Sequence, residues 1–148
     1  MGTMSGSFRH IRDTPPVIAL IPAVAVIIDY ALTFSLSSGT DMILQWEASP
    51  LVRFAVAHNI MAVYLPTIVI FYYCAAYAVL RILYATPYYP YGILLVVLVS
   101  ATHILGGLSW QVKNSWYSDT VIAISILSII ISVSLFGYCL FRQNRTAS

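Results

Sequence analysis

Residues 54–80 read FAVAHNIMAVYLPTIVIFYYCAAYAVL, and this stretch contains no Lys, Arg, Asp or Glu. As a helix that rises 1.5 Å per residue it would extend about 40 Å, more than the ~30 Å hydrocarbon core of a bilayer. The whole chain of 148 residues is 60% hydrophobic and 8% charged, whereas a soluble domain carries about 25% charged residues. The sequence therefore predicts an all-α, polytopic membrane protein.

The apolar runs predict four transmembrane helices in one antiparallel bundle, a single transmembrane domain that occupies residues 1–148. Ser49 and Pro50 are typical of a helix start, with a capping hydroxyl before a proline in the first turn, and Ser118-Asp119 is expected to cap the last span. Pro66 is expected to kink the second span, because its ring removes a backbone hydrogen bond. The spans are expected at about residues 17–36, 52–82, 92–108 and 120–141.

Cationic residues set the expected orientation, because cytoplasmic segments carry an excess of Lys and Arg. Five arginines fall on the side of both termini and the middle turn, and two cations fall on the other side. We therefore expect an integral protein of the cell or plasma membrane with both termini in the cytoplasm. The five are Arg9, Arg12, Arg81, Arg142 and Arg145, and the two are Arg53 and Lys113.

Ionisable residues inside the runs are few, and their depths coincide. Asp29 lies about seven residues before the end of the first span, and His103 about five residues before the end of the third. His58, followed by Asn59, lies at a similar distance from the start of the second span. In an antiparallel bundle these positions fall in one layer roughly 10 Å below the outer surface. An ionisable group at that depth costs ~2.5–3.5 kcal/mol on insertion scales, so each side chain should face a partner or a wet cavity.

Two interpretations of this layer need no cofactor. In the first, Asp29 pairs with a histidine, with Asn59 or with Arg53, and this polar network holds the helices together. In the second, Asp29 exchanges protons during transport. A four-helix chain with one acid in the first helix resembles the small multidrug transporters in outline, although none of that family's motifs is matched residue by residue.

Two further interpretations require a cofactor. Asp29, His58 and His103 together form a ligand set that suits Zn²⁺, Fe(II) or a similar metal ion. Alternatively, His58 and His103 are the axial ligands of a haem, with Gly106 and Gly107 leaving room for the flat ring.

Part of the chain resembles a family of small prokaryotic four-helix membrane proteins of unknown function. The resemblance rests on Asp29 and Thr33 in the first helix and on EASPLVR at residues 47–53, and it covers about the first third of the chain. Members carry a Glu-Ala-Asn-Pro-like start to the second helix, where this chain has Ser49 in place of Asn. The resemblance implies the four-helix architecture and an outer-face polar site at Asp29 and Glu47, and it implies no reaction.

These features favour a small integral membrane protein that acts as a non-enzymatic subunit or an oligomer-forming component. Its expected partners are the lipid bilayer and further copies or other membrane subunits, whereas a net charge of +2 does not suggest nucleic acid. A metal- or haem-dependent redox or hydrolytic membrane enzyme and a small proton-coupled transporter stay open as alternatives. The expected polar site comprises Asp29, His58, His103, Asn59, Glu47 and Arg53.

Overall fold

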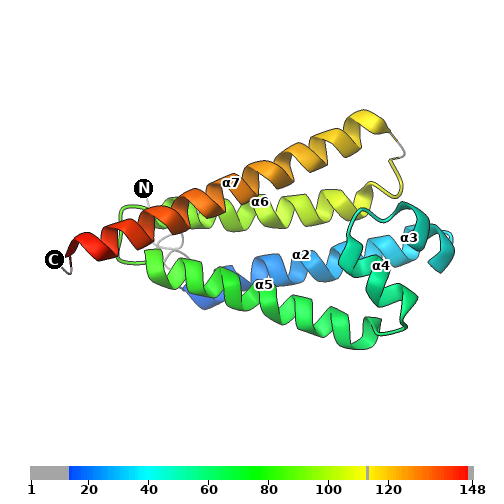
Figure 1. Cartoon of the computed structure of the whole chain (residues 1–148), viewed down its shortest axis with the longest axis horizontal. Coiled ribbons are helices and arrows are strands. Elements are labelled where there is room, and N and C mark those ends of the chain that lie inside the picture. The colour runs from blue at the N-terminus through cyan, green and yellow to red at the C-terminus, as the bar shows by residue number, and fades with distance from the viewer. Residues whose placement is uncertain (1–13, 113, 147–148) are drawn as a thin grey trace, which may run out of the picture.

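The computed structural model describes residues 14–112 and 114–146, and its regular elements in these ranges are all helices (Figure 1). Four are long: α2 (Pro15–Leu36), α5 (Met61–Leu83), α6 (Tyr89–Leu108) and α7 (Ser115–Thr146). Each contains a segment long and apolar enough to cross a membrane. The prediction of an all-α protein with four transmembrane helices is confirmed.

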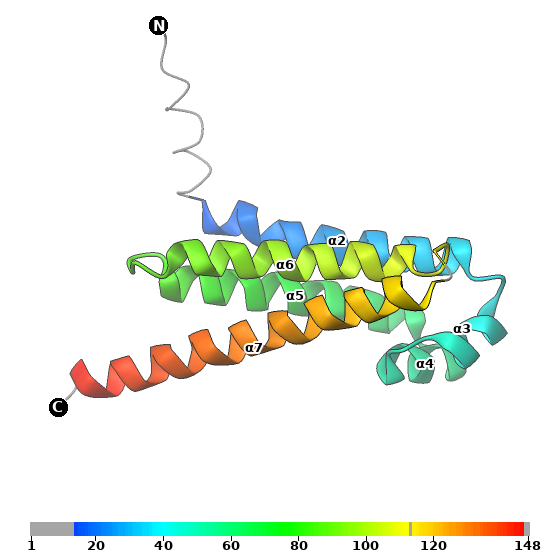
Figure 2. The same ribbon diagram turned by 90° about the horizontal axis from the view of Figure 1, so that it is seen from above.

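The long helices run antiparallel in chain order, with α2 packed against both α6 and α5. Helix α7 packs mainly against α6 and is inclined to the other long helices (Figure 2). The start of α2 and the end of α7 lie at one end of the bundle. Two short helices, α3 (Thr40–Trp46) and α4 (Pro50–Ala57), lie at the opposite end. We call residues 40–57 the α3–α4 arm.

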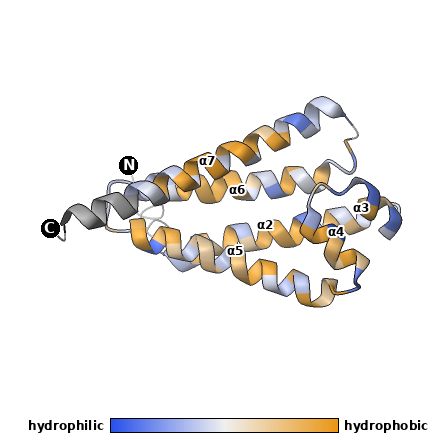
Figure 3. Cartoon of the chain, in the orientation of Figure 1, coloured by the Kyte–Doolittle hydropathy of each residue, from blue (hydrophilic) through white to orange (hydrophobic). Residues whose placement is uncertain are grey.

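Hydropathy follows this arrangement closely. The long helices are apolar over most of their length, and polar residues gather near the α3–α4 arm and the turns (Figure 3). One apolar core, which includes Leu80 and Leu83, lies where α2, α5 and α6 meet near the end opposite the arm. A second core joins the arm to the bundle: Val26 and Tyr30 of α2 pack with Ile43 and Val52 of the arm. The arm is therefore anchored on the spans by apolar contacts.

The second predicted span is interrupted where the sequence predicted a continuous helix. Residues 52–57 belong to α4, and a new helix begins at Met61 and continues through Pro66. The break falls at residues 58–60, where Asn59 has a φ of +57°. Asparagine is one of the few residues that enters this left-handed region readily, so the helix breaks at this turn.

The start of the last helix also differs from the prediction, whereas the expected cap of α4 is confirmed. The last helix begins at Ser115 and not near residue 120, because Asn114 Oδ1 accepts the N–H of Trp116 at 3.0 Å. The expected cap at Ser49 is present, since its Oγ accepts the N–H of Val52 at 3.5 Å. Of the cationic residues that set the expected orientation, Arg9, Arg12 and Lys113 lie outside the described residues.

Candidate functional site

Asp29 and His103 meet inside the membrane-spanning part of the bundle. His103 Nδ1 donates a hydrogen bond to Asp29 Oδ2 at 2.8 Å, which links α2 to α6. The two side chains are 20% and 19% exposed for His103 and Asp29 respectively. Because the long helices alternate in direction, α2 and α6 run parallel to each other, and this brings the two positions to one depth, as the sequence predicted for this pair (Figure 1).

One glycine, Gly107, allows α2 and α6 to approach closely at this point. A Cβ added to Gly107 would lie 2.9 Å from the backbone oxygen of Asp29 and 3.0 Å from its Cα, closer than real Cβ contacts. At Gly106 the nearest atom would be Asp29 Oδ1 at 3.9 Å, an ordinary contact. Gly107 therefore sets the separation of α2 and α6 beside the Asp29–His103 pair. The space that the haem interpretation assigned to a flat ring is occupied at Gly107 by the backbone of Asp29.

Tyrosines surround the pair on the α5 side. The Tyr72 ring meets the His103 ring edge to face, with 4.7 Å between the ring centroids and an interplanar angle of 86°. Next to Asp29 along α2, Tyr30 donates its hydroxyl to the Tyr64 hydroxyl at 3.1 Å. Sequence reasoning did not assign Tyr30 or Tyr64 to the site, although the position of Tyr30 beside Asp29 was a usable signal.

Glu47 reaches the same region from the loop between α3 and α4. Its Oε1 accepts the backbone N–H of Ser49 at 2.9 Å. Burial raises the pKa of the Glu47 carboxyl above its ordinary value, and the negative charge of Asp29 raises it further, whereas the N–H of Ser49 and the charge of Arg53 lower it.

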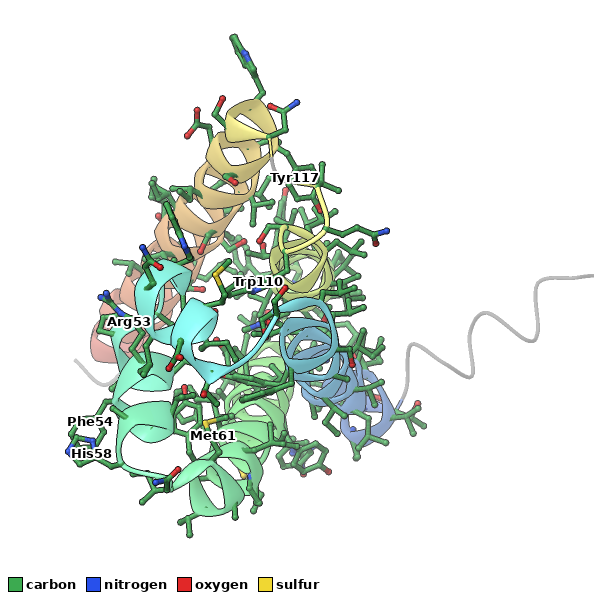
Figure 4. All side chains as sticks on the ribbon, turned by 90° about the vertical axis from the view of Figure 1, so that its right-hand side faces the viewer. Arg53, Phe54, His58, Met61, Trp110 and Tyr117 are labelled. Atoms are coloured by element: carbon green, nitrogen blue, oxygen red, sulfur yellow. The ribbon has the colours of Figure 1, made fainter. Side chains whose placement is uncertain are left out.

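His58 lies elsewhere, so the expected three-residue layer is not assembled. It caps α4 and is exposed, and its Nδ1 donates to the carbonyl of Phe54 at 2.9 Å. Figure 4 shows His58 and Phe54 together on the outer side of the short helix α4, away from the long helices. The break at residues 58–60 explains the difference, because it turns this segment out of the span. Asn59 and Arg53 are also exposed.

The metal and haem predictions both required His58 beside His103, and this requirement is not met. Within residues 14–112 and 114–146, no group of three His, Cys, Asp or Glu side chains is placed to hold a metal ion. His58 and His103 therefore cannot serve as the two axial ligands of one haem, and Asp29, His58 and His103 do not form a ligand set.

The arrangement that remains is a carboxylate–imidazole hydrogen bond between two membrane-spanning helices. A carboxylate that accepts the Nδ1–H of a histidine fixes the tautomer of the ring and leaves Nε2 with a free lone pair. The same bond is a polar contact between two helices in an apolar medium, where such contacts contribute about 0.6 kcal/mol on average.

Comparisons with known proteins identify no relative. No protein-family model, no curated protein and no solved structure matches the chain. The resemblance to the prokaryotic four-helix family therefore rests on the residues of its motif alone.

Proposed function

We propose that the protein is a non-enzymatic component of a membrane assembly, with the Asp29–His103 pair as its intramembrane polar site. Because the arginines are in excess on the side of the termini, both termini lie in the cytoplasm in this proposal and the α3–α4 arm faces outward. In this proposal the hydrogen bond between Asp29 and His103 fixes α2 against α6. Helices α5 and α7 then present the surface on which other copies or subunits assemble.

The exposure of α7 carries this proposal. Within its membrane-crossing segment, Ser115–Leu135, 6% of the residues of an 18-residue apolar stretch are buried in the protein. The corresponding share in α2 is 44%. The residues that face α6 include Ser128, whose hydroxyl donates to the carbonyl of Ile124 at 2.9 Å. Helices in a bilayer associate through close packing and polar contacts and not through apolar area alone. A span held mainly by one neighbour is thus free to pack against a second protein.

Cysteine cross-linking in native membranes tests the assembly. The exposed Val133 of α7 is replaced by Cys in a chain from which Cys74 and Cys139 have been removed. In the same background, the exposed Val63 of α5 is replaced by Cys for comparison. We expect Val133→Cys to form a cross-linked species of higher mass. A chain that stays monomeric with cysteine at either position, and that releases only monomer in native mass spectrometry, would rule the proposal out.

The geometry also favours a second candidate, a small proton-coupled transporter that uses Asp29. The supporting observation is that His103, with Nδ1 engaged by Asp29, is one-fifth exposed and so can exchange a proton at Nε2. Proteoliposomes that enclose a pH-sensitive dye would report proton flux under an imposed gradient. The transporter requires that Asp29→Asn abolishes the flux while His58→Ala leaves it intact. Equal flux in all three proteins would exclude it.

A further inference from the structure

The α3–α4 arm lies at the boundary of the bilayer, because short links tie it to two spans. Residues 37–39 connect α2 to the arm, and residues 58–60 connect the arm to α5. A link of three residues reaches at most about 14 Å across its four Cα–Cα steps. Helix α5 has 23 residues, which gives about 35 Å and is enough to cross the hydrocarbon by itself. The arm is therefore held near the level at which hydrocarbon gives way to headgroups.

Helix α4 is apolar on both of its sides. Its inner face buries Val52, Ala55 and Val56 against the bundle. Its outer face exposes Leu51 at 63% and Phe54 at 55%. A helix whose exposed side is also apolar matches lipid better than water, since each apolar Å² left in water costs about 25 cal/mol.

The polar atoms on the outer face are arranged in a way that suits this position. The rings of Phe54 and His58 lie 4.1 Å apart between centroids, and the carbonyl of Phe54 accepts the Nδ1–H of His58. This hydrogen bond satisfies Nδ1 of His58, and the imidazole ring extends the apolar outer face of α4. Arg53 lies at the edge of this face with its side chain exposed (Figure 4). Aromatic rings beside a basic group are typical of the membrane–water interface.

We propose that the outer face of α4 binds phospholipid directly. Leu51, Phe54 and the ring of His58 contact the acyl chains at the edge of the hydrocarbon, and the Arg53 guanidinium binds a lipid phosphate. A planar guanidinium offers paired N–H donors that match phosphate oxygens. The α3–α4 arm is then an interfacial anchor and not a water-exposed loop.

Spin-label accessibility tests the position of the outer face. A nitroxide is attached at Ala57→Cys in the full chain lacking Cys74 and Cys139, reconstituted in phosphatidylcholine vesicles. Labels at Val63→Cys on α5 and at Ser38→Cys beyond α2 give the reference accessibilities for a site in lipid and a site in water. The proposal requires the label at residue 57 to be more accessible to oxygen than to a water-soluble nickel chelate, as at residue 63.

Two other outcomes overturn the proposal. Greater accessibility to nickel, as at residue 38, would place the arm in water. Low accessibility to both reagents would show that a protein partner or a second copy covers the face. The Arg53 contact is tested separately in protein carrying ¹³C at the arginine Cζ atoms, through dipolar coupling to lipid ³¹P. Arg53→Gln should remove the dephased signal of one arginine, and an unchanged dephased signal would refute the phosphate contact.

Discussion

Replacing Gly107 by alanine tests the close approach of α2 and α6. The added methyl group would lie 2.9 Å from the backbone oxygen of Asp29, 3.0 Å from its Cα and 3.0 Å from Leu32 Cβ. Ordinary contacts begin at about 3.4 Å, so the helices must separate by a few tenths of an ångström. Backbone atoms cannot rotate away as a flexible side chain can. Overpacking of this kind costs about 1–3 kcal/mol, and the separation also lengthens the 2.8 Å bond between Asp29 and His103.

Gly106→Ala is the matched control, because it adds the same atom one residue earlier on the same helix. Its nearest neighbour would be Asp29 Oδ1 at 3.9 Å, so no steric cost is expected. Alanine in place of glycine also favours a helix by about 0.8–1.0 kcal/mol, and this gain applies to both variants. Thermal unfolding in detergent, followed by circular dichroism, should give a lower Tm for Gly107→Ala than for Gly106→Ala. Equal midpoints for the two variants would refute the close approach.

Three further substitutions have defined outcomes. Tyr64→Phe removes the hydroxyl that accepts the bond from Tyr30 and should lower the free energy of unfolding by about 1 kcal/mol, so an unchanged value would remove that bond from the account. Burial and Asp29 raise the pKa of Glu47 in the folded protein, so ionisation of Glu47 destabilises the fold. The contribution of Glu47 to stability should be greatest below its ordinary pKa of 4.5. It should fall as the pH rises through the higher pKa of the folded state. Glu47→Gln should remove this loss, giving a variant more stable than wild type at pH 7 and similar at pH 4 in detergent melts, whereas the exposed Asp41→Asn should leave the pH dependence intact. His58→Ala should change stability by less than about 0.5 kcal/mol, and a larger loss would show a tertiary contact that the exposed His58 does not make.

The architecture was predictable because it depends on long apolar runs. Four long apolar segments with few charges dictate four spans, and alternation of direction then brings Asp29 and His103 to one depth. Which of the two candidate histidines meets Asp29 depended on a local backbone feature. The left-handed Asn59 ends α4 and turns His58 outward, and periodicity does not reveal such a turn inside an apolar run.

The tyrosine contacts were harder to predict for a different reason. Tyr30, Tyr64 and Tyr72 occupy helical positions that are equally compatible with packing against lipid or against protein. Their partners are set by the rotation of each helix about its axis, and the apolar composition leaves that rotation undetermined. Similarly, the role of Gly107 depends on which face of α6 meets α2, whereas the glycine pair by itself also fitted a space for a ligand.

A double-mutant cycle on Asp29 and His103 measures the bond between α2 and α6 apart from the other effects of each substitution. The free energies of unfolding of Asp29→Ala, His103→Ala and the double variant are measured in the same detergent, with a parallel cycle on Asp29 and His58. The account predicts a coupling energy of about 0.5–3 kcal/mol for Asp29 with His103 and none for Asp29 with His58. Additive effects of Asp29→Ala and His103→Ala would contradict it.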